Sequence, residues 1–199
     1  EKLFHQRRAI IKSSLAFSLL TFSSLVFPNT KPLSFSKDLK YSTNEQTNTL
    51  KQITSYNNFY ELGSGKRDPM NNADKLNTNN WKVTVDGEVE NKFILDSEDF
   101  TKKFPLEERI YRLRCVEAWS MVIPWIGFEL NHLIKLAKPT HKAKYISFES
   151  IYDPDNLPGQ KRDILAWPYR EGLRLDEARN PLTILSVGLY GRILPNQNG

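Results

Sequence analysis

Alternating apolar and polar positions predict most of the folded part of this chain as strands. In "WKVTVDGEV", Trp81, Val83 and Val85 share one face while polar side chains occupy the other, which is typical of a half-buried strand. The segment "KFIL" is expected to be its partner, and "KYISFESIY" alternates in the same way. The apolar run "LTILSVGLYG" predicts a buried strand.

Helical periodicity is confined to short segments. The segment "GFELNHLIKLAKP" predicts a helix that ends at Pro139, with apolar side chains at helical spacing at Leu130, Leu133, Ile134 and Ala137. "DSEDFTKKF" and "GLRLDEARNP" predict shorter helices or turns. Strands dominate and do not alternate regularly with helices, so the predicted class is α+β with mixed or antiparallel sheets.

The pattern divides the chain into three parts. Residues 1–34 contain Arg7 and Arg8 ahead of a mostly apolar run, which resembles a twin-arginine export signal. An uncleaved amphipathic anchor is the alternative, because the run is short for a membrane span. Residues 35–54 are rich in Asn, Thr, Ser and Lys and predict a flexible linker. Residues 55–199 form the predicted domain, whose final "LPNQNG" indicates that a C-terminal part is missing.

Composition and residue spacing argue against several classes of function. The formal net charge of +5 is spread over scattered basic pairs, which does not favour a nucleic-acid partner. One cysteine cannot form an internal disulfide, and the three histidines show no zinc-ligand spacing.

Cys115 is the candidate for chemistry. It is expected to close the alternating strand "RIYRLRCV", on the same apolar face as Tyr111 and Leu113. Four interpretations are open: a buried apolar side chain, a nucleophile, a redox thiol, or one soft thiolate ligand to a metal whose other ligands belong to a cofactor. The last explains why a single cysteine would suffice.

Several longer strings narrow these alternatives. "SYNNFYELG", "FPLEERIYRLRCVEAWS", "EGLRLDEA", "NPLT" and "LPNQNG" occur in this order over residues 55–199. Together they closely resemble the catalytic subunit of periplasmic molybdopterin-dependent methionine sulfoxide reductases, which belong to the sulfite oxidase-like family. The resemblance implies the sulfite oxidase-type fold and a molybdenum-molybdopterin cofactor.

The resemblance also assigns site residues. It implies that Cys115 binds molybdenum, and that Glu117 and Asn58 lie close to the metal. Glu117, two residues after Cys115, would face the same side on a continuing strand and could relay a proton, or it could instead form a structural salt bridge with an arginine. The implied pterin contacts are Asn57, Tyr60, Glu61, Ser150 and Asn198, with Ser150 standing where the family has threonine.

The activity implied by the resemblance is reduction of free and protein-bound methionine sulfoxide in the periplasm. Its electrons would come from a membrane haem-binding subunit that draws on quinol, and oxidised periplasmic proteins would be substrates. Two alternatives are kept: a sulfite-oxidising enzyme of the same fold, which would need a cluster of arginines, and a secreted non-catalytic binding domain.

Overall fold

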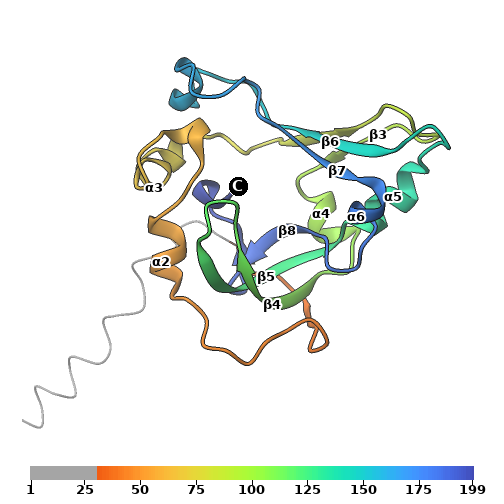
Figure 1. The fold of residues 1–199 in the computed structure, drawn as a ribbon, viewed down its shortest axis with the longest axis horizontal. Helices are drawn as coiled ribbons and strands as arrows, with labels where there is room; N and C mark the ends of the chain where they lie inside the picture. The colour runs from red at the N-terminus through yellow and green to blue at the C-terminus, as the bar shows by residue number, and fades with distance from the viewer. Residues whose placement is uncertain (1–30) are drawn as a thin grey trace, which may run out of the picture. The chain divides into compact units, whose positions relative to one another are not determined.

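A curved, mixed sheet of five strands organises residues 31–199, which the computed structural model describes as one unit (Figure 1). Its strand order is β1-β4-β5-β8-β9, with β1 parallel to β4 and all other pairs antiparallel. Two antiparallel pairs, β2-β3 and β6-β7, stand outside it. The described strands are β1 (Ser36–Lys37), β2 (Lys82–Val85), β3 (Phe93–Asp96), β4 (Glu107–Arg114), β5 (Ser120–Glu129), β6 (Tyr145–Glu149), β7 (Arg170–Arg174), β8 (Ile184–Leu189) and β9 (Arg192–Ile193).

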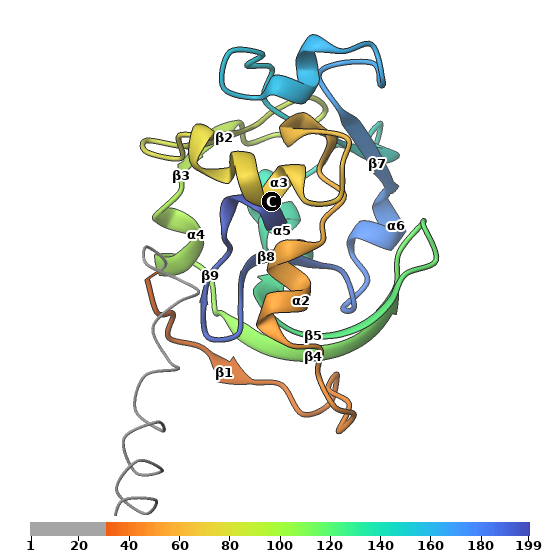
Figure 2. The same ribbon diagram turned by 90° about the vertical axis from the view of Figure 1, so that its left-hand side faces the viewer.

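Helices in this part of the chain are short and connect or cover the strands. They are α2 (Leu50–Ser55), α3 (Asp68–Asn72), α4 (Asp99–Lys102), α5 (Leu130–Ala137) and α6 (Leu175–Ala178), with 3-10 turns η1 (Tyr60–Leu62), η2 (Ala73–Lys75), η3 (Pro158–Lys161) and η4 (Asn196–Asn198). In Figure 2 the C-terminal η4 lies beside α2 and α3, and side-chain hydrogen bonds tie it to α2. The arrangement confirms the predicted α+β class with mixed sheets.

Two apolar clusters form the core. The larger lies where α4 and the β2-β3 pair pack on the sheet, and its buried members are Leu95, Phe100, Phe104, Leu106, Ile126 and Phe128. The rings of Phe104 and Phe128 stack with centroids 4.1 Å apart. The smaller cluster holds α5 and α6 against β6-β7 through Leu130, Ile134 and Ala178.

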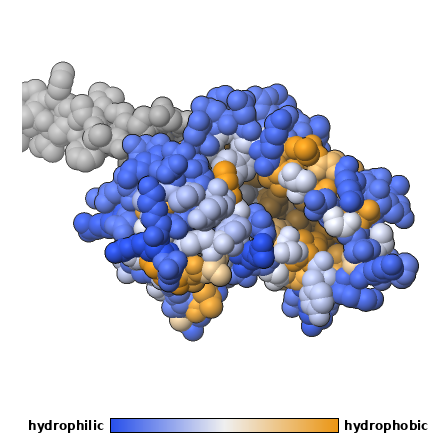
Figure 3. Space-filling model, turned by 90° about the horizontal axis from the view of Figure 1, so that it is seen from above, coloured by the Kyte–Doolittle hydropathy of each residue, from blue (hydrophilic) through white to orange (hydrophobic). Residues whose placement is uncertain are grey.

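Exposed apolar surface remains outside these clusters. Figure 3 shows apolar side chains gathered in a hollow between hydrophilic rims on one face. Large exposed apolar residues are frequent in the segment that joins β6 to β7, namely Ile151, Tyr152, Ile164, Leu165 and Tyr169. Among residues 31–199, no helix is long and apolar enough to cross a membrane.

Several predicted boundaries were wrong. The helix or turn predicted from Gly172 begins at Leu175, because the residues before it pair with β6 in β7. The helix predicted from residue 127 begins at Leu130, because residues 127–129 continue β5 and pair with β8. Gly127 permits this pairing, since a Cβ there would lie 2.3 Å from the Leu185 carbonyl oxygen. The helix predicted to open at Asp96 begins at Asp99, because Asp96 still pairs in β3.

Another error concerns residues 35–54, which are not a free linker. The Ser36 and Asp38 amides donate to carbonyls of β4 and its approach, at 3.0 Å each. Further along, Asn48 donates to the Val122 carbonyl at 2.9 Å and accepts from the Val122 amide at 2.8 Å. The composition of this segment is polar because it pairs through its backbone at a sheet edge rather than through an apolar face. Residues 1–30, which make up nearly all of the predicted export signal at residues 1–34, lie outside the described residues.

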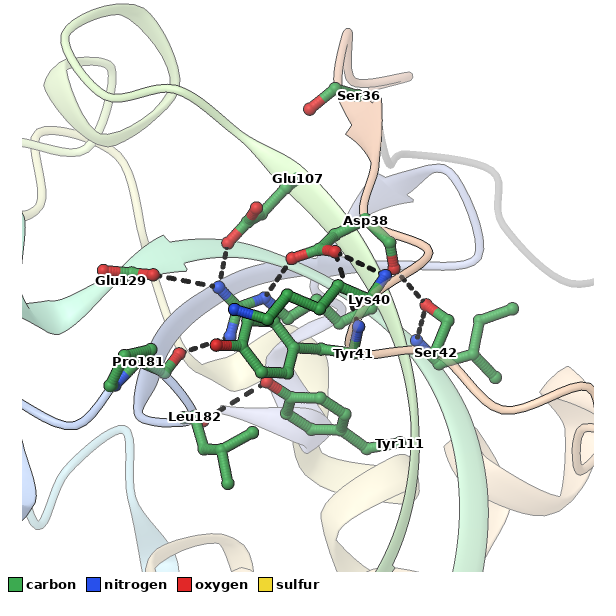
Figure 4. A network of polar contacts seen from close by, with 12 residues as sticks. Ser36, Asp38, Lys40, Tyr41, Ser42, Glu107, Tyr111, Glu129, Pro181 and Leu182 are labelled. Carbon is green, nitrogen blue, oxygen red and sulfur yellow. Dashed lines mark hydrogen bonds and ion pairs between the residues drawn. The ribbon is translucent and has the colours of Figure 1, made fainter.

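One buried arginine ties this N-terminal segment to the domain (Figure 4). Arg109 of β4 has 1% of its side chain exposed, and its guanidinium pairs with Glu107, with Glu129 at 3.4 Å and with Asp38 at 3.5 Å. It also donates to the Tyr111 hydroxyl at 2.7 Å and to the Pro181 carbonyl. The network therefore joins the N-terminal segment, the sheet and the loop before β8.

We expect Arg109→Met to lower the free energy of unfolding by about 3 kcal/mol, the low end for breaking a buried ion pair, because it leaves three partly exposed carboxylates without their shared cation. Urea denaturation followed by circular dichroism measures this loss. Arg112→Met is the matched control, because Arg112 lies on the same strand but is exposed and, among residues 31–199, forms its salt bridge with Glu45. Equal losses in the two variants would contradict a special role for the buried network.

Candidate active site

The hairpin between β4 and β5 carries Cys115 on a tight turn. β4 ends at Arg114, and the Cys115 amide donates to the Trp119 carbonyl at 3.1 Å. The Ala118 amide donates to the Cys115 carbonyl at 2.9 Å, and Ala118 has φ of 63°. A three-residue loop that ends in a left-handed residue is a standard hairpin connection. Cys115 therefore flanks the turn instead of closing the strand, and its side chain is half-buried.

Glu117 consequently lies at the tip of the turn, so the predicted strand-like alternation with Cys115 was wrong. Its carboxylate accepts a hydrogen bond from the Asn58 side-chain amide, across 59 residues of sequence. Lys66 lies 3.6 Å from the second carboxylate oxygen and donates to the Asn58 amide oxygen at 2.6 Å. The salt-bridge alternative for Glu117 thus has a partner, but it is a lysine and not an arginine.

Lys66 was not among the site residues predicted from the sequence. Its ammonium group lies 5.2 Å from the Trp119 ring centroid and 5.5 Å from that of Tyr60. Tyr56 packs on Trp119 with ring centroids 5.0 Å apart. A lysine within "GSGKRD" reads as an exposed turn residue, so no signal in the sequence connected it with Glu117.

Two asparagines from distant segments meet beside this turn. The Asn57 and Asn198 side-chain amides both donate to the Ile53 carbonyl, at 2.9 and 3.1 Å. Both side-chain oxygens are buried and have no hydrogen-bond partner. These residues, together with Asn58, Phe59, Gln197 and Gly199, line a cavity of about 220 Å³. Buried acceptors without a partner are rare, and both belong to residues that line this cavity, which marks it as the candidate ligand site.

Glu61 and Ser150 form a second polar contact behind the same loop. Glu61 is 6% exposed, and the Ser150 hydroxyl donates to its carboxylate at 3.3 Å. Gly159 of η3 packs so closely on η1 that a Cβ would lie 1.7 Å from the Tyr60 carbonyl oxygen. Burial raises the pKa of the Glu61 carboxyl, although hydrogen bonds from its backbone and from Ser150 oppose part of that rise.

A family model described as the oxidoreductase molybdopterin binding domain matches residues 70–199. The chain belongs to this family. It is therefore a molybdopterin-dependent oxidoreductase domain with a molybdenum-molybdopterin cofactor, and membership also confirms the predicted fold. The match includes Cys115, Glu117 and Ser150, whereas the loop of residues 57–66 precedes it.

The residues of this family member fit a pterin. The pterin ring carries N–H groups that can donate hydrogen bonds to the unpartnered side-chain oxygens of Asn57 and Asn198. Its ring nitrogens and oxygen can also form hydrogen bonds with the Ser150 hydroxyl and the Glu61 carboxyl group. Tyr60 adjoins Glu61 on η1. Cys115 would supply the thiolate donor for molybdenum. The structure thus brings Glu117, Ser150 and Asn198 to the loop that carries the other predicted contacts, and Cys115 lies two residues from Glu117 on the facing turn. Their individual roles stay predictions.

The pKa of Glu61 gives a stability prediction. Because its folded pKa is raised, its stabilising contribution is complete only below its unfolded pKa of about 4.3 and is lost as pH rises through the folded value. We therefore expect Glu61→Gln to raise the melting temperature of protein purified without cofactor at neutral pH, but not near pH ~4. Thermal melting across this range measures it, with exposed Glu149→Gln as the control. An increase in melting temperature that is the same at neutral pH and at low pH would contradict this explanation.

Proposed function

We propose that this protein reduces methionine sulfoxide to methionine, both free and within proteins. The observation that carries the proposal is the Glu117–Asn58–Lys66 group beside Cys115. It offers a hydrogen-bonding carboxylate, but no surplus positive charge, because the Lys66 charge is already opposed by Glu117. A neutral sulfoxide suits such a surface, and the sequence resemblance to methionine sulfoxide reductases supports the same substrate.

Sulfite is the competing substrate, and its negative charge distinguishes the two. A sulfite dianion approaching Glu117 would meet a like charge, which is unfavourable in a partly desolvated site. Two of the three arginines on β4 are engaged elsewhere, since Arg112 pairs with Glu45 and Arg109 is enclosed by its own carboxylates. Arg114, exposed beside Cys115, is a single cation and not the cluster of arginines that a sulfite site needs. These contacts favour the sulfoxide.

The proposed reaction consumes two electrons and two protons and releases the sulfoxide oxygen as water. The molybdenum group supplies the two-electron chemistry when it is bound. Glu117 would relay protons to the departing oxygen, because a positioned carboxylate can take up a proton from solvent and pass it on as a general acid. Asn58 would orient Glu117 through its N–H donor, and Cys115 would hold the metal.

Comparing turnover of the two substrates tests the proposal. The purified, molybdenum-loaded protein should oxidise a reduced dye with methionine sulfoxide and show little sulfite oxidation. A peptide containing methionine sulfoxide should also be reduced. Sulfite oxidation without sulfoxide reduction would overturn the assignment.

We also propose a periplasmic location, with electrons supplied by a membrane haem-binding subunit and oxidised periplasmic proteins as substrates. The Arg7-Arg8 pattern supports export, and the resemblance supports the electron donor. Cell fractionation tests the location, and recovery of all active protein in the cytoplasm would contradict it.

A further inference from the structure

Lys66 makes more contacts with the candidate site than a surface lysine requires. Its ammonium group reaches the Asn58 amide oxygen at 2.6 Å and the Glu117 carboxylate at 3.6 Å, and it lies over the rings of Tyr60 and Trp119. Its side chain is 31% exposed and that of Glu117 is 28% exposed. These charges are thus partly desolvated, which makes their interaction stronger than that of a fully exposed pair.

The first contact determines how the Asn58 amide is oriented. An ammonium group has three donors and no acceptor, so it selects the amide oxygen and turns the amide N–H₂ toward Glu117. The opposite orientation would place two donors together and would set an amide oxygen against a carboxylate oxygen. Lys66 therefore decides that Glu117 receives a hydrogen bond from Asn58.

Lys66 also connects two segments of the chain, the loop of residues 57–66 and the β4–β5 turn. The Lys66 backbone carbonyl accepts from the Asn57 amide at 2.9 Å, which closes the loop of residues 57–66 on itself. The Lys66 side chain then reaches Glu117 at the tip of the β4–β5 turn. One residue thus holds the loop that carries Asn57 and Asn58 in register with the turn that carries Cys115.

We propose that Lys66 is a positioning residue of the active site, which orients Asn58 and Glu117 and fixes the Cys115 turn against the loop of residues 57–66. The proposal rests on the proposed function for its kinetic consequence, but its structural consequence is independent of any substrate. Lys66 acts through Asn58 and Glu117 and is not asked to contact the sulfoxide.

The kinetic test uses molybdenum-loaded protein and three variants. Lys66→Met keeps an unbranched side chain that is one atom shorter and removes the charge, and Lys66→Arg keeps the charge. Arg67→Met is a control at the neighbouring exposed position. We expect Lys66→Met to lower kcat per bound molybdenum about tenfold or more, because small misplacements of catalytic groups are costly, while KM changes little. Lys66→Arg should recover most of kcat, and Arg67→Met should match the parent.

The second arm measures hydrogen–deuterium exchange by mass spectrometry in the same proteins. Lys66→Met should raise exchange in peptides covering residues 57–66 and in those covering 115–119, with the rest of the domain unchanged. If the parent reduced no sulfoxide, the proposed function would fail while this arm still reported on Lys66.

Two outcomes would overturn the proposal. Unchanged exchange in both segments would show that Lys66 does not hold them together. A Lys66→Met variant with normal kcat per molybdenum, but with lower melting temperature and metal content, would show a purely structural role.

Discussion

Replacing Cys115 with serine is expected to abolish sulfoxide reduction while the fold survives. The change exchanges a soft thiolate donor for a hydroxyl group, which is a poor ligand for molybdenum, and alters side-chain volume little. Cys115 is half-buried on a turn whose hydrogen bonds are made by the backbone, so the turn should persist. Activity with methionine sulfoxide, molybdenum content and circular dichroism measure the three parts of this expectation.

Val116→Ser is the matched control for this variant. Val116 is fully exposed in the same turn, so the control introduces the same hydroxyl one position away without removing the thiolate. It should retain molybdenum and activity. A Cys115→Ser protein that reduced methionine sulfoxide at the parent rate would show that Cys115 is an ordinary apolar residue.

Replacing Glu117 with glutamine is expected to slow oxygen transfer about 100-fold or more, the lower range for loss of a general acid. Glutamine can still accept from Asn58 through its oxygen, but its amide nitrogen would face Lys66 and cannot supply the proton. Molybdenum content should not change, because Glu117 is not proposed as a ligand. Single-turnover rates per bound molybdenum measure the effect.

The control for Glu117→Gln is Glu45→Gln, which makes the same chemical change in a salt bridge outside the site. It should leave the rate per molybdenum unaltered. If Glu117→Gln lowered only the melting temperature and kept a normal rate, the carboxylate would be a structural partner of Lys66. Proton delivery would then fall to Asn58 and bound water.

Local patterns in the chain were sufficient for about half of the elements of the fold, whereas the central strand β5 had no predicted counterpart. The alternation in residues 81–85 and the helical spacing from Leu130 to Ala137 are local properties, and the structure places a strand and a helix there. Their ends were predicted less well. Pairing with a distant strand extends β5 through Glu129, and such pairing has no local signal.

The sequence by itself determined the identity of the candidate residues, because a long string around Cys115 resembles one family closely and the family model confirms the wider assignment. Only the tertiary structure decided how those residues meet. Glu117 faces Asn58 because the chain turns at Val116–Ala118, and Lys66 enters the site because a distant loop folds onto that turn. Contacts across 50 or more residues depend on packing and charge in three dimensions, so periodicity along the chain carries no trace of them.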